Sequence, residues 1–196
     1  MSLPLPAGRP RDGELTERVL TEVVRHIMRE GLPTFRIETI AQRALTTKPA
    51  IYRRWPNRID LILDGIERVL SAGAVPDTGD LLSDLQEYAA LTPYENAEPL
   101  DSGSARNFYC TVLNPEVLPR FMDRFGRERR EVGLQVLETW VGRGVLPENL
   151  DGTLFLDTLL GVTVYRSLMT GDIVPPGQYQ QLLEALVDKP PLLPRV

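Results

Sequence analysis

The chain has 196 residues, of which 42% are hydrophobic and 25% are charged, proportions that suit one or two globular domains. No apolar run approaches the ~18–20 residues that span a bilayer, and the single cysteine, Cys110, excludes an internal disulfide and a thiolate zinc site. The net charge of -5 is uneven, because residues 1–60 hold eleven Arg and Lys against seven Asp and Glu, whereas the remainder holds eleven against twenty. The composition therefore predicts a cytoplasmic protein with a basic first third on an acidic body.

Proline and glycine mark the first boundaries in the chain. Residues 1–13 contain three prolines and two glycines, and they predict a flexible arm rather than a regular element. Apolar residues at helical spacing predict one helix over residues 14–29, closed by Gly31, and a second over residues 37–45. A longer helix begins at Asn57, a good N-cap, and continues to about residue 70. Residues 73–79, with two glycines and Pro76, then predict a domain boundary.

A short basic helix is predicted over residues 47–55. Thr47 is a good N-cap, Pro49 is tolerated in the first helical turn, and Pro56 ends the element. A helix this short is stable only when neighbouring elements hold it. A short basic helix presented by a scaffold is typical of one that reads the major groove of DNA. The alternative is a solvated helix of an ordinary helical bundle.

The rest of the chain is also predicted to be helical, over residues 81–91, 104–113, 116–141, 154–170 and 178–187. The segment 154–170 is apolar nearly all round, so it must be covered on more than one side. No convincing alternating strand is present, and the fold class is therefore all-α.

Chemistry-bearing residues are sparse. The only histidine, His26, leaves no material for a His-based metal site, and we expect it to be structural or exposed. We expect Cys110, beside Phe108 and Tyr109, to be a small buried apolar residue. The carboxylates fall on solvated faces without a convincing acid/base pair, and no phosphate-binding glycine loop is present. The sequence therefore predicts no enzyme, no metal and no cofactor.

The first four helices resemble those of TetR-family regulators. The resemblance covers about residues 8–70 and rests on Ile40-Ala41, Ala44, Thr47-Lys48, Ile51-Tyr52-Arg53-Arg54-Trp55-Pro56, Asn57-Arg58 and Leu61. Arg36 departs from the Ser or Thr that commonly caps the second helix, and Arg58 departs from a common lysine. Leu45 replaces the usual glycine of the turn, so a comparable turn requires either a positive φ or a different route. The stretch 150–171 resembles the C-terminal dimer helix of some members.

The resemblance implies an all-α homodimer with an N-terminal helix-turn-helix DNA-binding domain over residues 14–72. A C-terminal ligand-binding and dimerisation domain would cover residues 79–190. Such a protein is a one-component transcriptional regulator, expected here to be a repressor that leaves a palindromic operator when a small effector binds. The alternative is a helical carrier of lipophilic ligands, or a helical enzyme, without DNA function.

The residues and the resemblance together give three sets of predicted contacts. The predicted DNA contacts are Arg9, Arg11, Arg36, Thr47, Lys48, Pro49, Ala50, Tyr52, Arg53 and Arg58. Within this set, the residues that would face base edges are Lys48, Pro49, Ala50 and Arg53. Phosphate contacts would come from Tyr52, Arg36 and Arg58. The minor groove would be entered by Arg9 and Arg11. The predicted dimer contacts are Phe155, Leu159, Val162, Tyr165, Arg166, Met169, Tyr179, Leu182, Leu183 and Leu186.

A set of aromatic residues and one arginine could line an effector pocket in the second half. The set comprises Tyr88, Phe108, Tyr109, Phe121, Phe125, Arg129, Trp140 and Tyr165, together with Tyr94. It predicts an apolar or aromatic effector without giving its identity. Each of these aromatic residues could equally be plain core, and Arg129 could pack its stem while its head reaches water.

Overall fold

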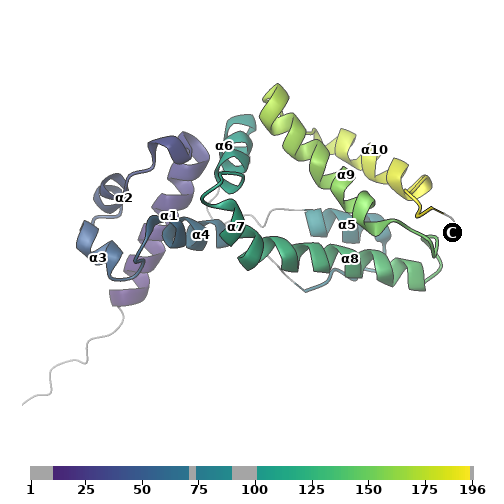
Figure 1. The fold of residues 1–196 in the computed structure, drawn as a ribbon, viewed down its shortest axis with the longest axis horizontal. Coiled ribbons are helices and arrows are strands. Elements are labelled where there is room, and N and C mark those ends of the chain that lie inside the picture. Colours follow the sequence, from purple (N-terminus) through teal and green to yellow (C-terminus); the bar gives the residue numbers. More distant parts are fainter. Residues whose placement is uncertain (1–10, 71–73, 90–100, 195–196) are drawn as a thin grey trace, which may run out of the picture.

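The fold is described from a computed structural model that covers residues 11–70, 74–89 and 101–194, with the backbone alone for Arg11 and Asp12 (Figure 1). Within these residues the regular elements are helices, and the one pairing of extended backbone is an isolated bridge between Leu150 and Leu192. The all-α prediction is therefore confirmed. No helix in this part of the chain is long and apolar enough to cross a membrane.

The first four helices lie at one end of the molecule (Figure 1). They are α1 (Arg11–Glu30), α2 (Ile37–Arg43), α3 (Lys48–Tyr52) and α4 (Arg58–Glu67), with a 3₁₀ turn at Leu32–Thr34. Helix α1 begins inside the segment that the sequence predicts as an arm, so that arm is at least three residues shorter than expected. A Cβ on Gly65 would lie 2.5 Å from Val23 Cγ1, so the glycine allows α4 to pack closely on α1.

The second half contains α5 (Leu81–Ala89), α6 (Ser102–Val112), α7 (Leu118–Phe121), α8 (Arg127–Gly142), α9 (Gly152–Tyr165) and α10 (Pro176–Asp188). The helix predicted over 116–141 is observed as continuous helical backbone from Leu118 to Gly142, but a π-helical turn, η2 (Met122–Gly126), lies within it between α7 and α8. A second π-helical turn, η3 (Arg166–Thr170), extends α9. Such turns occur mostly inside α-helices, so a helical pattern in the sequence does not reveal them.

Two apolar cores hold these helices together. The first core contains Val23, Ile40, Ile51, Leu61 and Ile66 from α1–α4, and it also takes Phe108, Val112, Val117 and Phe125 from the α6–η2 region. The second core contains Leu85, Val136, Leu137, Phe155, Leu156, Leu159 and Leu183. Because the first core includes side chains from both halves, the helix-turn-helix segment is packed directly on the body.

Candidate nucleic-acid interface and sensor core

The turn between α2 and α3 keeps a regular geometry despite Leu45. Leu45 has a φ of 52°, the one positive φ among non-glycine residues in the described part of the chain. The Thr46 N–H donates to the Ala41 carbonyl at 2.9 Å, and the Leu45 N–H donates to the Gln42 carbonyl at 3.2 Å. These two bonds form a Schellman motif, which normally places glycine where Leu45 stands. The sequence left two possibilities for this turn, a positive φ at Leu45 or a different backbone path. The structure shows the positive φ.

Helix α3 presents a basic, exposed face. Thr47 caps it, since its Oγ1 accepts a hydrogen bond from the Ala50 N–H at 3.3 Å, and Pro49 stands in the first turn. Ile51 and Trp55 are buried in the first core, which fixes the helix on its scaffold. The side chains left exposed are Thr47, Lys48, Pro49, Tyr52 and Arg53. Five of the ten predicted DNA-contact residues therefore share one short surface.

Ala50 does not belong to this surface. It is only 7% exposed, so the prediction that it faces base edges is at odds with its position. A methyl side chain gives no sequence signal for the face it occupies, whereas the larger Ile51 and Trp55 do. Arg9 lies outside the described residues, as do the side chain of Arg11 and the whole of Tyr94.

Two further predicted phosphate contacts are exposed at helix starts. Arg36 precedes α2 without capping it by its side chain, and its Nη1 donates to the carbonyls of Phe35 at 2.9 Å and Pro33 at 3.1 Å. Arg58 begins α4 and pairs with Glu116, with Nη2 3.3 Å from Oε2. Both guanidinium groups are thus oriented by contacts within the chain.

Glu38 on α2 is a functional neighbour that the sequence reasoning missed. Its carboxylate forms an ion pair with Lys48, which raises the pKa of Lys48 and lowers that of Glu38. The Lys48 ammonium also lies 5.7 Å from the centroid of the Tyr52 ring. The ten-residue separation crosses a turn, so helical spacing alone could not have paired the two side chains.

A hydrogen-bonded bridge links the end of the α3 segment to the body. Trp55 Nε1 donates to Asp64 Oδ2 at 2.6 Å, and Arg124 Nη1 in η2 donates to Asp64 Oδ1 at 2.6 Å. Beside it, Arg120 of α7 donates to Asp60 Oδ1 at 2.8 Å. One carboxylate of α4 therefore contacts both the helix-turn-helix segment and the π-helical turn.

The carboxylate of Asp84 on α5 is fully buried, so the expectation that the carboxylates lie on solvated faces is wrong here. Oδ1 accepts from the Thr78 N–H and hydroxyl, both at 2.6 Å, and Oδ2 accepts from Trp140 Nε1 at 2.8 Å. Burial works to raise the pKa of Asp84, but these hydrogen bonds prevail and lower it. Trp140 is 56 residues away in the sequence whereas Thr78 is only six, and the group is structural.

The predicted effector residues do not form one pocket. Trp140 belongs to the second core as the partner of Asp84, whereas Tyr165 is 60% exposed. Phe108, Phe121 and Phe125 lie in or against the first core. Tyr109 packs against the first core and Tyr88 is buried in the second, and Tyr88 Oη is one of two buried side-chain oxygen atoms that have no hydrogen-bond partner in the described residues. The other is Ser167 Oγ in η3.

The predicted dimer contacts divide into three groups by burial: fully buried, partly buried and exposed. Phe155, Leu159 and Leu183 are fully buried within one chain, so they cannot meet a partner in this conformation and that part of the prediction is wrong. Arg166 donates to Gln178 Oε1 at 3.0 Å, and Val162, Tyr179, Leu182 and Leu186 are partly buried. Tyr165 and Met169 remain exposed, at 60% and 71%, and Leu154 is an exposed apolar neighbour on α9 that the sequence reasoning left out.

The burial of the single histidine and of the single cysteine tests two predictions from the sequence. His26 is buried, with Nε2 3.2 Å from Thr34 Oγ1 and its ring edge-on to Phe35, so the structural interpretation is confirmed. Cys110 is exposed, so its predicted burial is wrong. Within the described residues no group of His, Cys, Asp and Glu could hold a metal ion.

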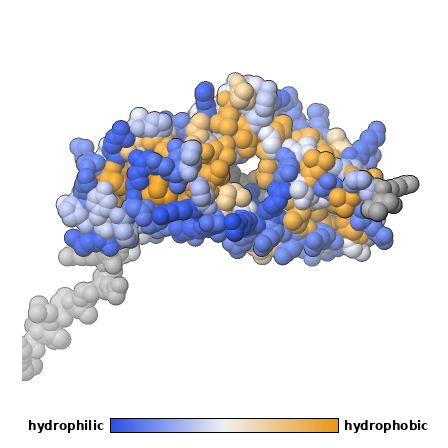
Figure 2. Space-filling model, in the orientation of Figure 1, coloured by the Kyte–Doolittle hydropathy of each residue, from blue (hydrophilic) through white to orange (hydrophobic). Residues whose placement is uncertain are grey.

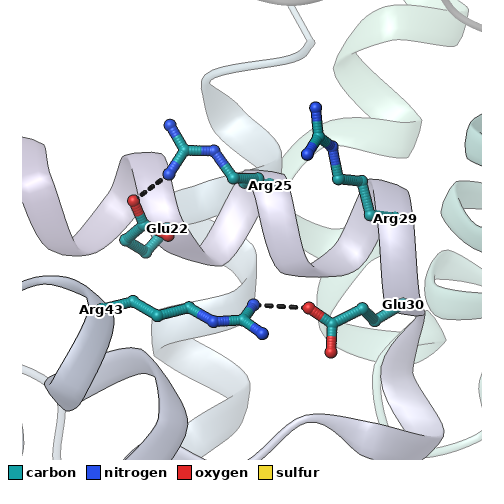
Figure 3. Close-up of a pocket in the computed structure, with 5 residues that line it drawn as sticks. All are labelled: Glu22, Arg25, Arg29, Glu30 and Arg43. Carbon is teal, nitrogen blue, oxygen red and sulfur yellow. Dashed lines mark hydrogen bonds and ion pairs between the residues drawn. The ribbon is translucent and has the colours of Figure 1, made fainter.

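An open surface pocket beside α1 and α2 is lined by charged residues, as Figure 3 shows. Arg25 pairs with Glu22, and Arg43 pairs with Glu30 across the two helices. Because the guanidinium groups of Arg25 and Arg43 are already paired with carboxylates, we assign no ligand to this pocket.

Known proteins are similar to this chain along most of its length. Residues 75–186 match the family model described as the tetracyclin repressor-like C-terminal domain. The chain is 29% identical over 185 residues to the HTH-type transcriptional regulator YdeS of Bacillus subtilis, which covers 90% of this chain and 89% of YdeS. It is 27% identical over 181 residues to the HTH-type transcriptional regulator Rv1556 of Mycobacterium tuberculosis, covering 91% and 85% of the two chains. Its fold is similar to the crystal structure of the TetR family transcription regulator SCO0332, with a TM-score of 0.55 at 20% identity over 89% of this chain and 97% of that one.

Proposed function

The chain belongs to the TetR family of transcriptional regulators, and we propose that it is a repressor that binds a palindromic operator as a homodimer and leaves it when a small effector binds. Family membership favours this regulator over the helical carrier or enzyme that the sequence also allowed. The observation that carries the proposal is the exposed basic face of α3, held by the buried Ile51 and Trp55 behind a regular turn.

In the proposed complex, α3 enters the major groove. Lys48 and Arg53 donate to guanine acceptors, and Pro49 makes apolar contact with a thymine methyl. Tyr52 donates to a phosphate and contributes affinity without base preference. Arg36 and Arg58 add phosphate contacts on either side of α3.

Two copies of the protein are required for a palindromic site. Two recognition helices must lie about 34–36 Å apart to enter successive major grooves on one face of the duplex. The exposed apolar side chains of Leu154, Tyr165 and Met169, on α9 and η3, provide the surface that a second copy would cover. This proposed dimer surface contains fewer of the predicted dimer-contact residues than the sequence analysis gave.

Release by an effector requires a link between the body and α3. Asp64, held by Trp55 on one side and Arg124 on the other, supplies such a link. An effector that binds better to the conformation in which the two α3 helices are wrongly spaced would shift the population away from DNA.

The proposal is tested by selecting binding sites from randomised duplexes with the full-length protein and then footprinting the enriched sequences. We expect an approximate palindrome bound by two protomers. Lys48→Ala should weaken binding by about 1–3 kcal/mol at its preferred base and relax the preference there. Tyr52→Phe should weaken binding to all sequences alike. An unchanged sequence preference in Lys48→Ala would defeat the assignment of base readout.

A further inference from the structure

The hydroxyl of Tyr88 is one of two buried hydroxyl groups that packing leaves without a partner in the described residues, and the other is that of Ser167. Tyr88 lies on α5 and is 4% exposed, and its Oη has no hydrogen-bond partner in the described part of the chain. Leaving a buried hydroxyl unpaired costs free energy, so nearly all such groups in folded proteins have a partner. A phenylalanine would fill the same space without that cost. The hydroxyl is therefore a candidate ligand-binding group.

Two residues of helix α8 lie beside Tyr88: Gly133 and the cationic Arg129. A Cβ on Gly133 would lie 2.7 Å from Tyr88 Oη and 2.5 Å from its Cζ, so only glycine allows the phenol to rest on the backbone of α8. One turn earlier, Arg129 Nη2 donates to the Tyr88 carbonyl at 2.7 Å, and its guanidinium carbon lies 5.3 Å from the ring centroid. A positive charge is thus fixed beside the phenol.

Two more phenols approach the same place from other helices. Tyr109 of α6 packs against the first core, whereas Tyr179 of α10 packs against the second core that contains Tyr88. Burial raises the pKa of Tyr179 to about 12, and the neighbouring Tyr109 and Tyr88 add to this shift while Arg129 opposes it. At neutral pH these phenols are protonated, and each can donate a hydrogen bond.

The three phenols and Arg129 therefore gather where the two apolar cores meet, and we call this place the seam. Figure 2 shows the surface hollowed near the middle of the molecule, between α6 and α9, with hydrophobic residues beside the hollow. A ligand at the seam would contact α5, α6, α8 and α10 together. Phe108 of the first core stacks edge-on against Tyr109, with 5.5 Å between the ring centroids, and adds an aromatic surface on this side.

We propose that the seam binds an amphipathic organic acid, with the carboxylate of the ligand accepting hydrogen bonds from Tyr88 Oη and Arg129 and its apolar body lying among the aromatic rings. This inference rests on the proposed function, because it names the chemical class of the effector. The donors at the seam are protonated phenols and the guanidinium of Arg129. Such a set selects an anionic acceptor over a neutral group of the same shape.

The experiment measures binding of carboxylates and their matched neutral amides to the full-length protein by titration calorimetry. The probes are phenylacetate and octanoate, compared with phenylacetamide and octanamide. We expect at least one acid to bind and its amide to bind about tenfold more weakly or worse, as for loss of a hydrogen bond to a charged group. Tyr88→Phe should weaken the acid by a similar factor, whereas Ser83→Ala, which removes an exposed hydroxyl from the same helix, should not.

Thermal unfolding of the unliganded variants separates ligand binding from a structural role. Tyr88→Phe should leave Tm unchanged or raise it, because the hydroxyl it removes has no partner within the described residues. A fall in Tm, equal affinity for acids and amides, or binding of no acid by the wild-type protein would each overturn the inference. DNA binding is measured separately, so a protein that binds its operator but no acid contradicts the effector class alone, whereas a protein that binds no duplex contradicts the proposed function.

Discussion

Glu38→Gln should strengthen DNA binding, because the Glu38 carboxylate occupies the Lys48 ammonium in the free protein. Both side chains are well exposed, 47% for Lys48 and 61% for Glu38, so the pair contributes little to stability. Breaking an exposed pair of this kind costs little free energy, but the wild-type protein must supply that cost whenever Lys48 turns to a base. Removing that cost tightens binding by up to about fivefold, and loss of a negative charge near phosphates acts in the same direction.

The assay is fluorescence anisotropy with a duplex selected by the wild-type protein, at two salt concentrations. Glu138→Gln, which removes one exposed carboxylate from α8, is the matched control and should change affinity much less. The gain for Glu38→Gln should shrink at high salt, because screening weakens charge interactions at exposed sites. Weaker binding by Glu38→Gln than by Glu138→Gln would refute the placement of Lys48 at the DNA.

Three further predictions concern the turn, the buried carboxylate and the exposed apolar surface. Leu45→Gly should raise the free energy of unfolding by about 1 kcal/mol in urea denaturation, because glycine adopts a positive φ without steric cost. Asp84→Asn should lower it by about 3 kcal/mol at pH 7, because an amide cannot accept from both Thr78 and Trp140 as the carboxylate does. Since the pKa of Asp84 is lowered, its stabilisation is present above the unfolded value of about 4 and is lost as pH falls through the folded pKa, so mutant and wild type should converge in acid. Met169→Glu should convert a dimer into a monomer in light scattering, and an unchanged mass would place the interface elsewhere.

The helix-turn-helix segment could be predicted closely because its signals are local. Thr47, Pro49 and Pro56 fix where α3 begins and ends within a few residues, and each acts through its own backbone or side chain. The sequence also limited the turn at Leu45 to two possibilities, a positive φ or a different backbone path. The face of α3 that Ala50 occupies was not predictable, because its side chain is too small to reveal burial by periodicity.

The body was predicted less well because its organisation depends on contacts remote in sequence. The apolar sequence of α9 indicates that other residues cover this helix. It does not indicate whether the same chain or a partner covers Phe155 and Leu159. Asp84 is buried because Trp140, 56 residues away, satisfies its carboxylate. In both cases the deciding interaction is tertiary, and no local pattern encodes it. The π-helical turn within the predicted 116–141 helix is a further feature that helical spacing does not reveal.

The most direct test of the central claim is the stoichiometry and affinity of the full-length protein on double-stranded DNA at low ionic strength. Analytical ultracentrifugation with the selected duplex should give two protomers per site, arranged on an approximate palindrome and lost as salt increases. A well-folded protein that binds no duplex under these conditions, or that binds as a single protomer without base preference, would contradict the account.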